Sequence, residues 1–168
     1  MAPADECLRL LMSRREVREY LPRPVPEELV MEVLEAGRVA GSAKNRQPWS
    51  FILVRDPERL AALSRFGQSA QHLARAAFGV VIVRSDEYFQ DPFDAGRAAQ
   101  NMMLAAHMLG LGSCPISLHN QEGARRFLGV PEGYVVQVCI AFGFAAPRAP
   151  RGKLLRRPLE ELLHFERW

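Results

Sequence analysis

One long segment, from Asp94 to Leu109, limits the folds open to this chain more than any other part of it. Its residues have helical spacing, and apolar side chains occupy nearly all of its sides. A helix of this kind is stable only when other elements cover it. The chain has 168 residues, of which 48% are hydrophobic, enough for one domain with a substantial core. We therefore expect a single domain over residues 1–168, with this helix buried inside it.

Shorter helical and strand patterns alternate along the rest of the chain. The expected helices carry apolar side chains at helical spacing and span residues 5–13, 26–40, 56–66, 70–76 and 120–128. The expected strands alternate or are continuously apolar and span residues 49–55, 79–83, 113–117 and 134–144. Because the strands are few and interleave with helices, we predict an α+β sandwich with a mixed, mostly antiparallel sheet flanked by helices.

The sequence changes character after about residue 145. The segment from 145 to 157 is rich in proline, arginine and glycine, and an apolar segment follows it as far as Trp168. Because an extended arm precedes this apolar segment, we expect the arm to dock on a second subunit.

The distribution of charge argues against two classes of partner. The net charge is +3, and the 22 basic residues are scattered among acidic ones without an aromatic-interleaved stripe, which argues against nucleic-acid binding. The longest apolar stretch contains Arg97, Asn101 and His107, so it is a poor membrane span. The first residues are acidic and lack an apolar signal region, and we expect a cytoplasmic protein.

The sequence lacks the motifs of several common chemistries. Cys7, Cys114 and Cys139 are widely spaced and form no CxxC pair, so we expect buried free thiols, with neither a zinc site nor a redox dithiol. Metal-ligand spacings, the GxGxxG and GxxxxGK[ST] fingerprints, and a catalytic triad around Ser42 are also absent from the sequence. We expect His107, in the long helix, to be a core residue.

The run from Gly41 to Trp49 joins an expected helix to an expected strand and differs from a plain connector. It carries a hydroxyl, two amides, a proline and a tryptophan. The side chains of Asn45 and Gln47 each have a donor and an acceptor, as does the edge of a planar heterocycle. The run therefore predicts contact with a flat ligand.

Two basic clusters and one strand end allow alternative interpretations. Arg14, Arg15 and Arg18 would either clamp a phosphate or form a solvated turn. The basic cluster at 151–157 would either join them on one phosphate or remain a solvated tail. A proline interrupts the expected strand 113–117, so the amides after it would either face a ligand or mark a simple strand exit.

Five segments, taken in order, carry a resemblance to a known family. They are Ser13–Tyr20, Ser42–Trp49, Asp94–Ile116, Leu128–Tyr134 and Arg156–Glu161. Their order and spacing resemble the nitroreductase family of flavin enzymes over essentially the whole chain. The resemblance implies a nitroreductase-like α/β sandwich that forms a homodimer, with two FMN molecules at the subunit interface.

The resemblance also implies which residues hold the phosphate of FMN. Arg14 and Arg15 would bind it directly, and Arg18 would approach the pyrimidine edge of the flavin. Lys153 and Arg156 would complete the phosphate site from the C-terminal arm.

The flavin ring would be held by residues of two chains. Ser42, Asn45 and Gln47 would reach it from the partner subunit. The ring would be lined by Pro115, Ile116 and Ser117, with the Ser117 N–H near flavin N5. No side-chain acid or base is implied, because the flavin carries the chemistry.

Three positions depart from the family pattern. Glu16 stands where the family often has a small hydroxyl residue near the phosphate, so we expect its carboxylate to point away or to pair with an arginine. Ala43 and Lys44 replace a common Ser/Thr pair. A family residue that approaches the flavin before the strand at 79–83 has no clear match, and the candidates are Gln68, Gln71 and His72.

The implied function is an FMN-dependent oxidoreductase. NAD(P)H would deliver hydride to flavin N5 and be replaced by a small electron acceptor such as a nitroaromatic or quinone, in a ping-pong sequence. Two alternatives stay open: another flavin reaction on the same fold, either oxidative flavin cleavage or reductive dehalogenation, and a non-catalytic flavin-binding module.

Overall fold

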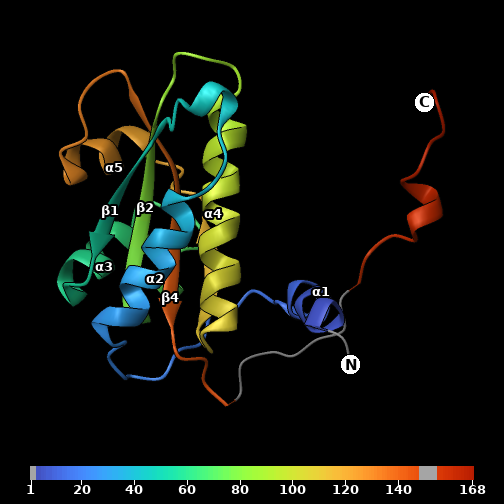
Figure 1. Ribbon diagram of the computed structural model, residues 1–168. Helices are drawn as coiled ribbons and strands as arrows, with labels where there is room; N and C mark the ends of the chain where they lie inside the picture. The colour runs from blue at the N-terminus through green and yellow to red at the C-terminus, as the bar shows by residue number, and fades with distance from the viewer. Residues whose placement is uncertain (1–2, 148–154) are drawn as a thin grey trace.

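The computed structural model describes residues 3–147 and 155–168 (Figure 1). The α-helices are α1 (Pro3–Ser13), α2 (Glu27–Arg38), α3 (Pro57–Ser64), α4 (Asp91–Met108) and α5 (Gln121–Leu128). The strands are β1 (Trp49–Val54), β2 (Phe78–Ser85), β3 (Gly112–Ile116) and β4 (Tyr134–Gly143). Short 3-10 helices are η1 (Ala43–Asn45), η2 (Gln71–Arg75) and η3 (Leu159–Glu161).

The four strands form one sheet in the order β1-β2-β4-β3, and every neighbouring pair is antiparallel. One parallel bridge, between Glu16 and Ser113, adds the segment after α1 to the edge at β3. The predicted α+β fold with a mostly antiparallel sheet is thus confirmed. The central strands β2 and β4 bury most of their residues on both faces, which explains their nearly continuous apolar sequences.

Each face of the sheet carries its own core, because successive residues of a strand point to opposite sides. Val80 and Ile82 pack with residues of α2 and α4. Val81 and Val83 pack with residues of α3, η2 and α5. Figure 1 shows α2 beside α4 on one side of the sheet, with α3 and α5 on the other.

The long helix differs from its prediction in two respects. It begins at Asp91, one turn before Asp94, with Pro92 in its first turn. It is also not covered on all sides, since Gly96, Arg97 and Gln100 are exposed. Gly96 and Met108 are apolar residues that nevertheless lie at the surface, so the sequence looks apolar on more sides than the fold covers.

Local signals placed several other element ends correctly. The Asp56 side chain accepts a hydrogen bond from Arg59 N–H at 2.8 Å and caps α3. Asn120 caps α5 in the same way, through the Gly123 N–H at 2.9 Å. Gly129 ends α5 with φ of 69°, a left-handed conformation that favours glycine.

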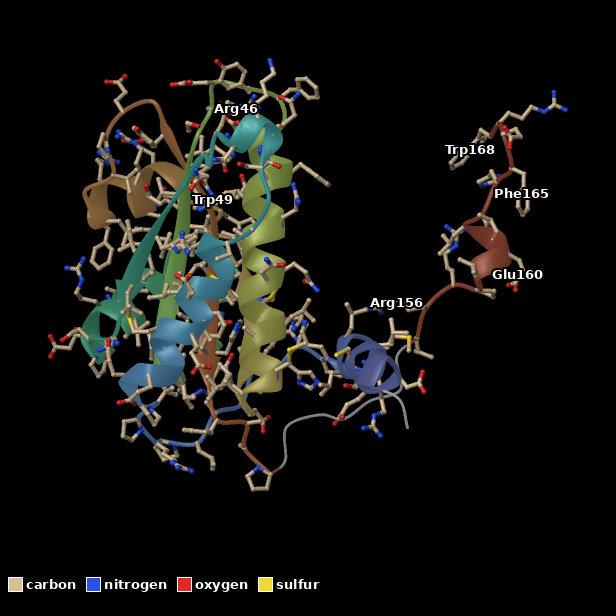
Figure 2. All side chains as sticks on the ribbon, in the orientation of Figure 1. Arg46, Trp49, Arg156, Glu160, Phe165 and Trp168 are labelled. Atoms are coloured by element: carbon tan, nitrogen blue, oxygen red, sulfur yellow. The ribbon has the colours of Figure 1, made fainter. Side chains whose placement is uncertain are left out.

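Two described segments present apolar side chains to solvent. Helix α1 exposes Leu8, Leu11 and Met12. The whole segment 155–168 is exposed, and Trp168 is 100% accessible. Figures 1 and 2 show this segment, with Phe165 and Trp168 labelled, standing apart from the sheet and its helices. No helix of the described residues is long and apolar enough to cross a membrane.

A methyl group added at Gly112 should weaken the attachment of the segment after α1. A Cβ there would lie 2.7 Å from the Cβ of Val17, a stiff β-branched residue. We expect Gly112→Ala to lower the free energy of unfolding by about 1–3 kcal/mol, measured by urea denaturation.

Gly96→Ala is the matched control for this substitution. Nothing lies within 4 Å of a Cβ at Gly96, which is in the interior of α4. Alanine there should raise the free energy of unfolding by about 0.5–1 kcal/mol. Equal effects of the two substitutions would contradict the close packing of Gly112 on Val17.

Candidate functional site

The basic segment after α1 lies beside the strand end that contains Pro115. The Val17 N–H donates to the Ser113 carbonyl at 2.9 Å, next to the parallel bridge between Glu16 and Ser113. Arg18 and Pro115 each lie two residues beyond this bridged pair. The structure therefore brings together two sets of residues that the sequence only suggested separately, 14–18 and 115–117.

The three arginines of this segment differ in the hydrogen bonds and ion pairs that their guanidinium groups make. Arg14 Nη2 lies 2.5 Å from Glu16 Oε1, and the Arg14 side chain is only 11% exposed. Arg15 Nη1 donates to the carbonyls of Met12 and Arg14 at 2.9 and 2.8 Å. Arg18 is exposed and has no hydrogen bond or ion pair with another described residue. Arg18 is thus the arginine most available to an incoming anion.

Glu16 pairs with an arginine, one of the two arrangements predicted for it. Its Oε1 meets Arg14, whereas its Oε2 is buried without a hydrogen-bond partner among the described residues. Glu16 also lies close to Cys114, and burial raises the pKa of the Cys114 thiol to about 11. The thiol therefore stays protonated at neutral pH.

A third segment reaches this edge of the sheet at residues 67–72. A Cβ at Gly67 would lie 2.9 Å from the Ser117 carbonyl oxygen, so the segment passes directly against the strand end. Gln68 and Gln71 are exposed, whereas His72 is buried and its Nε2 has no partner in the described part of the chain. Of the three candidates for the missing family residue, His72 is thus the one that points inward.

The amide-rich run 42–47 forms a tight turn with unusual backbone angles. Lys44, Asn45 and Gln47 have φ values of 52°, 55° and 51°. A left-handed conformation costs a non-glycine residue roughly 1–2 kcal/mol, somewhat less for asparagine. The Ser42 hydroxyl accepts a hydrogen bond from the Gln47 N–H at 2.9 Å, so it is used inside the turn. The side chains of Asn45 and Gln47 are exposed.

Two buried aspartates at the start of α4 hold this turn, and neither was predicted as a site residue. Asp94 Oδ2 accepts a hydrogen bond from the Ala43 N–H at 2.8 Å. Asp91 Oδ1 lies 4.0 Å from Arg46 Nη2. Figure 2 labels Arg46 where the turn meets the beginning of α4. The sequence signal was a pair of carboxylates at the head of an otherwise apolar helix, which resembles ordinary helix capping.

The basic segment and the amide-rich turn lie at opposite ends of α4. Asp94 contacts the turn, and His107, thirteen residues later, has its Nε2 3.0 Å from the Ser13 hydroxyl next to the basic segment. At 1.5 Å per residue these anchors are roughly 20 Å apart. Figure 1 shows the two ends of α4 well separated. One chain therefore does not bring Asn45 and Gln47 to Arg18 and Pro115.

Of the two C-terminal residues assigned to the phosphate, only Arg156 lies in the described part of the chain, and there it does not join the basic segment. Lys153 lies outside the described residues. Arg156 is exposed, and its guanidinium donates only to the Leu155 carbonyl, at 3.0 Å, within the described ranges.

The cysteines are free, as predicted, but one is not buried. Cys114 and Cys139 are buried, and burial raises the pKa of the Cys139 thiol to about 12. Cys7 is exposed on α1. The prediction of three buried thiols was wrong for Cys7, because α1 packs only at its end. Within residues 3–147 and 155–168, no group of three or more His, Cys, Asp or Glu residues is placed to hold a metal ion.

Comparisons with known proteins agree on one family. The model of the nitroreductase family matches residues 11–72 and 67–144. A protein of Archaeoglobus fulgidus named "Putative NADH dehydrogenase/NAD(P)H nitroreductase" is 31% identical over 173 residues, covering 98% of this chain and 99% of that protein.

Solved structures give the same result. A Bacteroides thetaiotaomicron protein of the same name is 28% identical, with a TM-score of 0.87 and full coverage, 100%, of both chains. An FMN-dependent nitroreductase from Clostridium difficile is 29% identical, with a TM-score of 0.84, covering 96% of this chain and 99% of that one.

The environment of His72 should make stability depend on pH. Burial, and after it the charge of Arg18, lowers the pKa of His72 below its ordinary value of 6.5. The unfolded chain then binds a proton more readily than the folded chain as the pH falls below 6.5. The free energy of unfolding should therefore fall on acidification below that pH and be insensitive to this group above it.

His72→Gln should flatten this dependence, measured by urea denaturation at a series of pH values. Part of the pH dependence should remain, because burial and the nearby Arg14 and Arg15 also lower the pKa of His107. Arg126→Gln, at an exposed position on α5, serves as the control. A slope that His72→Gln leaves unchanged would show that His72 is not destabilised as a cation in the folded chain.

Proposed function

This chain belongs to the nitroreductase family, and from that premise we propose that it is an FMN-dependent oxidoreductase. It would pass hydride from NAD(P)H to a small electron acceptor such as a nitroaromatic or a quinone. The observation that carries the proposal is the meeting of the basic segment 14–18 with the strand end 115–117 at the edge of the sheet, in a chain of this family.

The chemistry of the residues present fits FMN. A phosphate needs fixed cations, and Arg14 and Arg15 supply two in the basic segment. Arg18, exposed and unpaired within the described ranges, is left available to the pyrimidine edge of the flavin. Arg14 is engaged by Glu16, so a phosphate would compete with that carboxylate. The exposed amides of Asn45 and Gln47 suit the alternating donors and acceptors of a flavin edge.

The protein's part in the reaction is to bind, orient and stabilise charge. When bound, FMN supplies a ring that accepts and returns hydride. Arg18 provides a fixed cation for negative charge on the pyrimidine side of the ring. Pro115 would give the ring an apolar wall, whereas the Ile116 side chain is buried in the core and would contribute through its backbone. The Ser117 N–H would serve as a donor at the hydride-carrying edge. NAD(P)H and the acceptor would use the same site in turn.

We propose further that the complete site needs two chains. The amide-rich turn and the basic segment are roughly 20 Å apart along α4 of one chain. Exposed apolar side chains on α1 and on 155–168 offer surface for a second copy. In a homodimer, Ser42, Asn45 and Gln47 of one chain would meet Arg14, Arg18 and Pro115 of the other, and the arm carrying Lys153 and Arg156 would complete the phosphate site.

The purified protein should be yellow and should oxidise NADH or NADPH once loaded with FMN. Arg18→Gln should weaken FMN binding about tenfold or more, since a hydrogen bond to a charged group contributes about 1.5–3 kcal/mol. The dissociation constant is measured by quenching of flavin fluorescence. Arg126→Gln, on the exposed surface of α5, should leave it unchanged.

Three outcomes would separate the proposed function from its rivals. A protein that neither binds FMN nor oxidises NAD(P)H would refute the proposal. A protein that binds FMN but is reduced by neither NADH nor NADPH would be a flavin-binding module. Flavin breakdown in air, or halide release from a halogenated aromatic, would indicate one of the other flavin reactions.

Charges placed in the apolar tail should separate the subunits. Leu159 and Leu163 are 67% and 47% exposed in the isolated chain. If they pack on a second copy, Leu159→Asp with Leu163→Asp should shift sedimentation from dimer toward monomer and weaken FMN binding, because buried carboxylates are costly. A wild-type chain that sediments as a monomer at all concentrations would rule out the dimeric site.

A further inference from the structure

We propose that Asp94 and Asp91 are positioning residues that hold the turn 42–47 in the shape and place from which Asn45 and Gln47 face the flavin. This inference rests on the proposed function. Neither aspartate would touch the flavin; each acts through the backbone or the arginine of the turn. The contacts that the two carboxylates make support this inference.

Asp94 is a buried carboxylate whose shortest hydrogen bond goes to the turn. It is 1% exposed, and its Oδ2 accepts from the Ala43 N–H at 2.8 Å. Its Oδ1 faces Arg97 Nη1 at a longer 3.4 Å. A buried charge is costly unless it is well paired, so its retention needs partners of this kind. The first turn of α4 also favours a negative charge through the helix dipole.

Asp91 faces the same turn at Arg46, three residues after Ala43. Its Oδ2 accepts from the Ser85 hydroxyl at 3.0 Å and from the Tyr88 N–H at 3.2 Å. Its Oδ1 is buried without a hydrogen-bond partner among the described residues and faces Arg46 Nη2 at 4.0 Å. The Arg46 guanidinium lies over the Tyr88 ring, 4.1 Å from its centroid. Arg46 is thereby held between a carboxylate and an aromatic ring.

The two anchors bracket two of the three residues of the turn that have positive φ. Ala43 precedes and Arg46 follows Lys44 and Asn45, both of which have positive φ. The bond from the Gln47 N–H to the Ser42 hydroxyl fixes the internal shape of the turn but does not tie it to α4. The aspartate contacts tie the turn to the long helix, together with the hydrogen bond from Arg46 Nη2 to Gln90 Oε1 at 3.3 Å, at the N-cap of α4. Strained backbone persists where surrounding contacts determine it, commonly at ligand sites.

The first test measures how readily the turn opens in the absence of any ligand. Lys44 and Lys153 are the only lysines in the chain, so a lysine-specific protease cleaves the turn at one position, after Lys44. Cleavage of a folded segment requires local opening. We expect Asp94→Ala to speed cleavage after Lys44 by about tenfold or more, the factor that corresponds to losing a charged hydrogen bond.

Two variants accompany Asp94→Ala in this measurement. Asp94→Asn keeps a neutral oxygen for the Ala43 N–H and should recover much of the wild-type protection, and it remains informative if Asp94→Ala fails to fold. Arg38→Gln removes an exposed ion pair on α2, and the protease should cleave this variant at the wild-type rate. Wild-type rates for both Asp94 variants would overturn the proposed anchoring.

The second test measures flavin affinity in the full-length protein, with FMN and with riboflavin as probes. Asp94→Ala should weaken both by a similar factor of about tenfold, because the turn faces the ring and not the phosphate. The flavin affinity of the Asp94→Asn variant should lie between that of Asp94→Ala and that of the wild type. Unchanged affinity in a variant whose turn has opened would overturn the positioning role. A wild-type chain that binds no FMN would instead overturn the proposed function, while the protease measurement still decides the anchoring.

Discussion

The packing of α4 on the central strands β2 and β4 is the contact on which the rest of the arrangement depends. Ala95, Met102 and Ala106 are almost fully buried there against Val80 and Phe142. This packing fixes the direction of α4, and the two parts of the proposed site lie at the two ends of that helix. At one end the aspartates hold the amide-rich turn, and at the other His107 meets Ser13 before the basic segment. The length of the helix thus sets the distance between the two parts.

Much of the fold could be predicted from the sequence, because its signals are local. Helices α3 and α5 begin at the caps Asp56 and Asn120, and α5 ends at Gly129, all through contacts within a few residues. The continuous apolar run of β2 requires burial on both faces. The start of α4 was missed because Asp94 has the character of a cap, although Pro92 allows the helix to begin one turn earlier. The exposed side of α4 was missed because Gly96 and Met108 are apolar and nevertheless lie at the surface.

The site was predicted less completely, for a physical reason. The basic segment and the strand end were recognised by residue type, and the pairing of Glu16 with an arginine followed from charge alone. The left-handed angles of Lys44 and Gln47 could not be predicted, since neither residue favours them and a carboxylate about fifty positions later fixes the turn. The separation of roughly 20 Å between the basic segment and the amide-rich turn is likewise a distance through space that no single motif encodes. The homodimer was implied by the family resemblance and stays a prediction.

The burial of the cysteines gives the chain a practical property. Cys114 and Cys139 are shielded by the sheet, and burial raises their thiol pKa values to about 11 and 12, so few thiolates form at neutral pH. Cys7 stands in solvent on α1. A maleimide dye would therefore attach at one native position without any engineered residue. Cys7 is on α1, which also exposes Leu8, Leu11 and Met12. The emission wavelength or the fluorescence polarisation of the dye would therefore change if another surface packed on α1.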